Sequence, residues 1–137
     1  MHMTSHRSGA LCGLVIAMLG GCASVDVQYP DGHRTRMSKV EFKAYSERVF
    51  RYQNRIVDRL IGADGAYGDE QDEPDARLSR AEEAMEEACR PLISLVSAKA
   101  EHRALGLSDK LEMPRAAPAC EHAVAAVDAL LPAAATR

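Results

Sequence analysis

The sequence is poor in aromatic residues and in net charge. Of its 137 residues only four are Tyr and two are Phe, none is Trp, and the formal net charge is −3. A general nucleic-acid-binding protein would carry a basic surface, so this class is excluded. Long apolar runs are also missing after residue 19, which excludes a protein with several membrane spans. The length supports one small domain with a modest core.

Motifs for catalysis and for metal binding are missing as well. The chain has no G-x-S-x-G, no H-E-x-x-H, no P-loop and no dinucleotide-binding fingerprint. The acids of residues 62–73 lack the spacing of a calcium loop, and His102 and His122 lie on different predicted helices. We therefore expect no enzymatic activity, no cofactor, no metal site and no small-molecule substrate.

The first residues have the composition of a signal peptide. Residues 1–8 contain Arg7 and no acid, and residues 9–19 form an apolar run interrupted only by glycine. This order is typical of the n-region and h-region of a secretory signal. The run is about half of the roughly 20 residues that a membrane-spanning helix needs.

The next residues, Leu19-Gly20-Gly21-Cys22, resemble the lipobox of bacterial lipoproteins. The resemblance implies that residues 1–21 are removed and that Cys22 becomes a lipidated N-terminus, held on a membrane by its acyl chains. The following residue is Ala23, where Asp would retain the protein in the inner membrane, so the implied location is the periplasmic side of the outer membrane. The alternative is an ordinary secretory signal that ends near Ala23.

Residues 22–37 have two interpretations. Val25 to Tyr29 alternates apolar and polar residues, Pro30-Asp31-Gly32 is a strong turn sequence, and the segment ends at Met37. This pattern predicts a short β-hairpin. The same residues are also suited to be a tether between the lipid and the folded domain, and the sequence does not decide between the two.

Residues 38–131 are predicted to form an all-α domain of three or four helices. Ser38 and Glu41 have the spacing of a capping box, which starts a helix at Lys39 that ends at Gly62. A second helix opens near Pro74, kinks or divides at Pro91 and ends at Gly106. Apolar residues recur along both helices at steps of three and four. On the first helix these residues are Phe42, Tyr45, Val49, Tyr52, Ile56 and Leu60, and on the second they are Leu78, Ala81, Met85, Ala88, Leu92 and Leu95.

The last part of the chain is predicted to be a connector followed by one more helix. Residues 107–117 form the connector, Pro118 starts the helix, and Pro132 closes it before a frayed tail of residues 132–137. Few and long helices joined by connectors of about a dozen residues predict an up-down bundle. Residues 62–73, rich in glycine and acids, are expected to be a flexible loop.

Cys89 and Cys120 are the two cysteines left after the signal peptide and the lipidation site are set aside. A pair of cysteines in an oxidising compartment predicts a disulfide. The spacing of a redox-active C-x-x-C motif is absent, so we interpret this disulfide as structural. It would constrain the unfolded chain by about 3 to 4 kcal/mol.

Four arginines form a stripe along one side of the first predicted helix. They are Arg48, Arg51, Arg55 and Arg59. Residues 33–61 carry eight basic and three acidic residues, a charge of +5, whereas residues 62–90 carry three basic and ten acidic residues, a charge of −7. We favour the interpretation that the stripe faces the glutamates of the second helix. The alternative is that the arginines bind an acidic helix, a carboxylate-rich peptide or an anionic lipid head group.

The expected function is that of a non-enzymatic binding or adaptor module that is lipid-anchored in the outer membrane, faces the periplasm and binds another envelope protein. The lipobox, the mature length near 110 residues, the helical domain and the disulfide resemble secretin pilotins, which implies binding of a secretin segment in a helical groove. An immunity or inhibitor lipoprotein against a periplasmic toxin and a structural envelope protein also fit these features.

Overall fold

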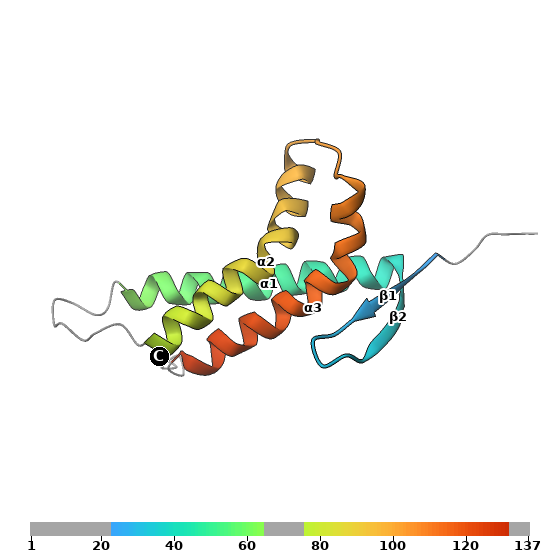
Figure 1. The fold of residues 1–137 in the computed structure, drawn as a ribbon. Helices are drawn as coiled ribbons and strands as arrows, with labels where there is room; N and C mark the ends of the chain where they lie inside the picture. The colour runs from blue at the N-terminus through green and yellow to red at the C-terminus, as the bar shows by residue number, and fades with distance from the viewer. Residues whose placement is uncertain (1–22, 65–75, 132–137) are drawn as a thin grey trace, which may run out of the picture.

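The computed structural model describes residues 23–64 and 76–131. In these ranges the chain forms a two-stranded hairpin followed by three helices (Figure 1). The elements are β1 Ser24–Gln28, β2 Arg34–Ser38, α1 Lys39–Asp64, α2 Ala76–Ala100 and α3 Leu107–Leu130. The predicted helical bundle is confirmed, and residues 25–37 are a hairpin and not a tether.

Several sequence-based predictions lie outside the described residues. They concern the signal peptide of residues 1–21, the lipidated Cys22, most of the acidic loop and the tail of residues 132–137. Within the described ranges, no helix combines the length and the apolar character that crossing a membrane requires.

The hairpin is held by its turn and by one buried valine. The strands are antiparallel, with Val25 opposite Met37 and Val27 opposite Thr35. The turn closes through the Gly32 N–H, which donates to the Tyr29 carbonyl at 2.9 Å, and Gly32 has φ +90°, a region that glycine adopts without strain. An isolated hairpin is only marginally stable, but Val27 has no exposed surface and joins the helical core.

Helix α1 begins as the capping box predicts. The Ser38 N–H donates to the Glu41 carboxylate at 2.7 Å, and the Glu41 N–H donates to the Ser38 hydroxyl at 3.2 Å. The predicted apolar face is the buried one, with Tyr45, Val49 and Ile56 at most 4% exposed. The helix ends at Asp64, two residues beyond the predicted end.

Helix α2 continues through Pro91 and bends, which confirms a kink in place of two separate helices (Figure 1). The predicted end at Gly106 is wrong, because the helix stops at Ala100. His102 adopts a φ of 54°, the Arg103 N–H donates to the Ala98 carbonyl at 2.8 Å, and the His102 N–H donates to the Lys99 carbonyl at 3.2 Å. This Schellman arrangement terminates the helix without a glycine.

Helix α3 is longer than predicted. The expected connector of residues 107–117 is helical, and Pro118 lies inside the helix instead of starting it. The start is fixed by Asp109, whose carboxylate accepts from the Gly106 N–H at 3.2 Å. Each internal proline removes one helical hydrogen bond, and α3 changes direction along its length (Figure 1). Packing against α2 keeps the helix continuous.

The bends of α2 and α3 create a helical arm. Residues 92–100 and 107–117, named the arm from here on, run antiparallel and rise away from the lower bundle (Figure 1). Below the arm, the first half of α2 and the second half of α3 pack with α1 around the core. The core extends into the base of the arm, and its buried side chains are Val27, Tyr45, Val49, Ile56, Met85, Cys89, Leu92, Met113, Ala117, Cys120, Val124, Val127 and Leu131.

Candidate binding surfaces on helix α1

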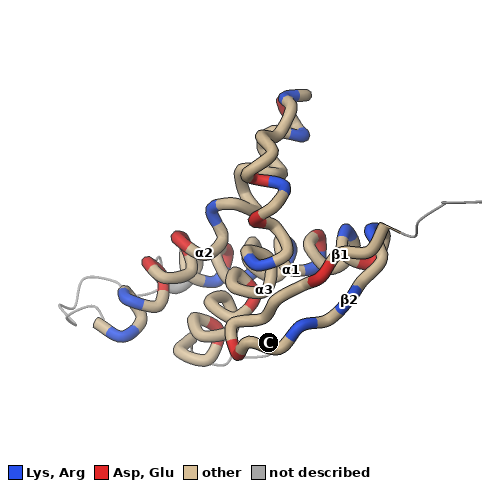
Figure 2. The backbone as a smooth tube through the Cα atoms, turned by 45° about the vertical axis from the view of Figure 1, so that its right-hand side comes forward, with Lys and Arg blue, Asp and Glu red and all other residues tan. Residues whose placement is uncertain are grey.

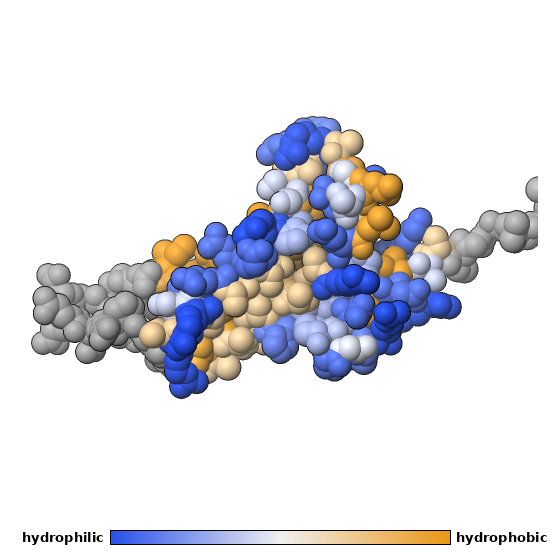
Figure 3. All heavy atoms as spheres, in the orientation of Figure 1, coloured by the Kyte–Doolittle hydropathy of each residue, from blue (hydrophilic) through white to orange (hydrophobic). Residues whose placement is uncertain are grey.

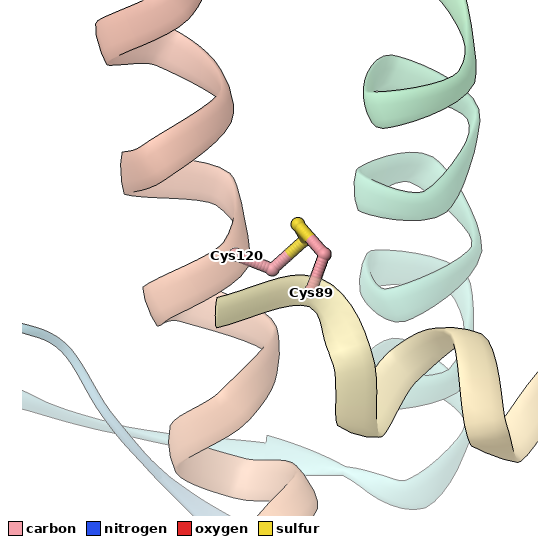
Figure 4. Close-up of a disulfide and its surroundings, with 2 residues drawn as sticks. All are labelled: Cys89 and Cys120. Carbon is pink, nitrogen blue, oxygen red and sulfur yellow. A yellow bond between two sulfur atoms is a disulfide. The ribbon is translucent and has the colours of Figure 1, made fainter. Parts of the chain in front are cut away.

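The predicted disulfide joins α2 to α3 at the base of the arm. Cys89 and Cys120 have their Cα atoms 4.5 Å apart and no exposed surface (Figure 4). Each cysteine lies two residues from a helix proline, Pro91 in α2 and Pro118 in α3. The bond therefore links the two helices at the places where prolines permit bending, and its burial supports a structural role.

Three arginines of the stripe lie on the exposed face of α1, directed away from the core. Arg48, Arg51 and Arg55 surround a shallow hollow of about 320 Å³ together with Asn54 and Asp58. We name this surface the arginine face. The hollow holds three guanidinium groups and one carboxylate, so its net charge is positive.

The arginines of this face have few partners. The Arg48 guanidinium carbon lies 5.3 Å from the centre of the Tyr45 ring, and that of Arg55 lies 5.4 Å from the centre of the Tyr52 ring. Both are cation–π contacts. Arg51 makes no hydrogen bond or ion pair with any residue that the structure describes.

The fourth arginine belongs to the contact between helices. Arg59 forms an ion pair with Asp128 of α3, and the two side chains are 33% and 35% exposed. Asp128 also accepts a hydrogen bond from the Tyr52 hydroxyl at 2.7 Å. The bond from Tyr52, followed by that from Arg59, lowers the pKa of Asp128 below its ordinary value. Arg59 therefore stabilises the packing of α1 on α3.

The interpretation that the stripe faces the glutamates of α2 is wrong for Arg48, Arg51 and Arg55. Within the two described ranges, no ion pair joins them to a carboxylate of α2, and Glu87 pairs with Arg90 of its own helix. The physical reason is the packing of α1: among the described residues, its hydrogen bonds and ion pair to another helix are made with α3. Figure 2 shows how charged positions of both signs are distributed along the backbone of the bundle.

A second contact between α1 and α3 was not anticipated from the sequence. The Tyr45 hydroxyl donates to the Glu121 carboxylate at 2.6 Å. Burial, together with this bond to a carboxylate, raises the pKa of Tyr45. The sequence contains a signal for this contact, because Tyr45 and Tyr52 are seven residues apart and so are Glu121 and Asp128. Tyrosines and acids with equal spacing on two helices are able to pair across a parallel contact.

An apolar groove lies between α1 and the arm, and it was also not anticipated. Its volume is about 300 Å³, and we name it the α1–α2 groove. The apolar side chains that line it are Val25, Phe42, Phe50, Leu92, Leu95 and Val96. The groove depends on the direction in which α2 bends after Pro91, which no local pattern in the sequence specifies. Figure 3 shows one face of the molecule, on which apolar side chains lie along one edge of the arm and polar side chains cover its tip.

Polar groups of the α1–α2 groove are mostly cationic. They are Lys39, Lys43, Arg51, Lys99, Glu47 and Ser46. The single acid, Glu47, pairs with Lys43 at 3.5 Å. The Ser46 side chain is buried at 7% exposure, and its hydroxyl has no hydrogen-bond partner in the described part of the chain.

Across residues 23–64 and 76–131, no three His, Cys, Asp or Glu side chains form a group that could hold a metal ion.

Comparison of the chain with protein-family models, with curated proteins and with solved structures finds no match. A functional interpretation therefore depends on the two surfaces of α1.

Proposed function

We propose that this protein is a lipid-anchored adaptor of the bacterial outer membrane that faces the periplasm and binds an acidic segment of another envelope protein through the arginine face. The observation that carries the proposal is the exposure of Arg48, Arg51 and Arg55, none of which forms an ion pair with a carboxylate of the described residues. Like charges at helical spacing repel one another. A partner carboxylate would relieve this repulsion, and guanidinium groups bind carboxylates with two parallel hydrogen bonds.

The proposed anchor fits the position of the hairpin. Ser24 begins β1 only two residues after Cys22 and is paired with Ser38, which caps α1. An extended residue spans at most about 3.6 Å, so a lipid on Cys22 would bring the start of α1 close to the membrane surface. The module would then be held there by its acyl chains while the arginine face binds the partner.

A pilotin-like mode, in which a helix of a secretin lies in a groove, has less support. A helix with its side chains is about 10–12 Å wide. The α1–α2 groove has a volume of about 300 Å³, which is small for such a partner. The arginine face lies on the exposed side of α1, so a partner segment does not have to enter a groove to reach it.

Photo-crosslinking in living cells tests the proposal. A photoreactive amino acid at Asn54, which lines the arginine face, should form an adduct with one envelope protein. The matched control places the same amino acid at Glu83, an exposed position of α2. This control should not form the adduct. The crosslinked segment of the partner should be rich in Asp and Glu.

Charge variants complete the test. Arg48→Gln combined with Arg55→Gln should abolish the adduct at position 54, and a synthetic peptide of the crosslinked segment should bind the wild type more weakly as salt is raised. The control is Lys110→Gln, which removes an exposed cation of the arm. An adduct that persists in the double variant, or a partner segment without acids, would show that the arginine face is not the binding site.

A further inference from the structure

We propose that the α1–α2 groove binds a single-chain anionic lipid, with the acyl chain on the apolar floor and the anionic head group against the lysines. The groove shares Arg51 with the arginine face, whereas Arg48, Asn54 and Arg55 line only the arginine face. A bound lipid would be a ligand and not a substrate of a reaction. It adds a small-molecule ligand that the sequence analysis did not anticipate.

The shape and lining of the groove favour an acyl chain. Six apolar side chains from β1, α1 and α2 line a space of about 300 Å³, at the lower limit of roughly 300–1,000 Å³ for ligand pockets. The residues Phe42 and Phe50 lie two helical turns apart on α1, so the floor is elongated along the helix. An extended hydrocarbon chain fits a narrow apolar floor better than a helix or a compact polar molecule does.

The charges at the groove favour an anionic head group. Four cationic side chains and one acid line it, and the acid Glu47 is already paired with Lys43. Lys39 is the first residue of α1, where the helix dipole adds positive potential. An uncharged lipid would not interact with these charges, whereas a carboxylate or a phosphate would be attracted by them.

The buried serine gives an independent reason to expect ligand oxygen atoms. Ser46 lies between Phe42 and Phe50 on the same face of α1, and its hydroxyl is buried without a hydrogen-bond partner among the described residues. Buried polar groups are nearly always hydrogen-bonded in folded proteins. An oxygen atom of a lipid head group in the groove would accept from this hydroxyl.

The groove lies close to the proposed membrane anchor, so we expect its ligand to come from the membrane. This step rests on the lipid anchor of the proposed function. Val25 lines the groove and follows Cys22 by three residues, so it lies within about 11 Å of the proposed lipidation site. The diacylglyceryl group of the anchor carries no anion. The lysines therefore favour a separate membrane lipid over the chain's own anchor.

The experiment uses the full-length protein in native membranes and three photoactivatable probes with the same acyl chain. The probes are diazirine analogues of oleate, of oleoyl lysophosphatidylglycerol and of oleyl alcohol. We expect the two anionic probes to label residues that line the groove, located by mass spectrometry, and the alcohol to label them at least about threefold less. Whichever anionic probe is displaced at the lower concentration of unlabelled competitor identifies the head group.

Two kinds of variant make the labelling specific. Lys39→Gln with Lys99→Gln should lower labelling by the anionic probes at least about threefold and leave the alcohol unchanged, and both positions are exposed, so the fold is retained. Val96→Phe fills the groove and should abolish labelling by all three probes. Lys110→Gln, an exposed cation outside the groove, is the matched control and should label as the wild type does.

Four results would overturn the proposal. They are labelling spread over the outer surface of the helices, equal labelling by the alcohol and the acids, anionic labelling that the lysine double variant leaves unchanged, and displacement of the probes by an acidic amphipathic peptide but not by unlabelled lipid. The last of these would make the groove a peptide site. Adduct formation at Asn54 tests the arginine face separately, so the failure of one proposal is distinguishable from the failure of the other.

Discussion

The Tyr45 hydroxyl of α1 donates a 2.6 Å hydrogen bond to the Glu121 carboxylate of α3. The same arrangement recurs seven residues later, where Tyr52 donates to Asp128 at 2.7 Å. Because the two steps have equal length and the same direction, α1 and α3 run parallel in a fixed register. Each tyrosine contributes its ring to the contact between helices and its hydroxyl to a carboxylate at the edge.

Replacement of Tyr45 should show how much this register contributes to stability. Tyr45→Phe keeps the ring and removes the donor, and a hydrogen bond to a charged group contributes about 1.5–3 kcal/mol. We expect the free energy of unfolding in urea to fall by about 1–2 kcal/mol, because Glu121 is half-buried and regains some hydration. Tyr52→Phe should cost less, since Asp128 keeps its pair with Arg59. Equal and negligible losses in both variants would contradict this role.

The raised pKa of Tyr45 predicts a loss of stability in alkali. Burial and the bond to Glu121 hold the folded-state pKa above the ordinary value of 10.0. A group whose pKa is raised by folding contributes stability that is complete below the unfolded pKa and is lost as the pH rises above it. The free energy of unfolding should therefore decrease above pH 10.0, and Tyr45→Phe should show a smaller decrease. Parallel curves for the two proteins would contradict the assignment.

The buried disulfide should account for a large share of the stability. Cys89 and Cys120 close a loop with a sequence separation of 31, which corresponds to about 3–4 kcal/mol in the chain-entropy model. For a domain of this size 1 kcal/mol shifts Tm by about 4–8 °C, so reduction should lower Tm by more than about 10 °C. Cys89→Ser with Cys120→Ser should melt like the reduced protein. Two freely alkylated thiols in the native protein would refute the bond.

The proposed lipidation of Cys22 predicts a defined biochemical result. Cys22→Ser should remove incorporation of radiolabelled palmitate and leave an unprocessed precursor, because the lipoprotein pathway requires the thiol. The matched control is Cys12→Ser, which lies within the expected signal peptide and should be processed normally. Equal palmitate incorporation into Cys22→Ser and wild type would exclude the lipobox interpretation.

The sequence was informative where local patterns determine the structure. The capping box at Ser38, the apolar faces of α1 and α2 and the turn at Gly32 depend on residues close in the chain, and the structure confirms each of them. The disulfide was also predictable, because only two cysteines remained for pairing. Periodicity shows which residues of a helix share a face.

Periodicity does not show which helix will cover that face. Because α3 packs beside α1, Arg59 pairs with Asp128 of α3. The glutamates of α2 were therefore the wrong partner, and Glu87 pairs within its own helix. The prolines of α3 misled the prediction for a related reason. Pro114 and Pro118 disfavour a helix locally, but packing of α3 on α2 and the disulfide at Cys120 hold it together.

Arg51 and Arg59 form a matched pair for testing whether the arginine face is structural. They occupy the same stripe of α1, yet Arg59 is paired with Asp128 and Arg51 has no ion pair within the described residues. Because the Arg59 pair is about one third exposed, solvent screens it, and Arg59→Gln should lower the free energy of unfolding by about 0.5–1 kcal/mol. Arg51→Gln should leave it unchanged or raise it by about 0.2–0.5 kcal/mol, since it removes repulsion from Arg48 and Arg55.

Salt gives a second test of the attraction between Arg59 and Asp128 and of the repulsion between Arg51 and its neighbouring arginines, because screening weakens both. In urea unfolding at low and high ionic strength, the deficit of Arg59→Gln should shrink with salt, and any gain of Arg51→Gln should shrink as well. A loss in Arg51→Gln as large as that in Arg59→Gln would mean that Arg51 is stabilised by a contact within the chain. Arg51 would then have a structural role, and it would not be available to bind an acidic partner at the arginine face.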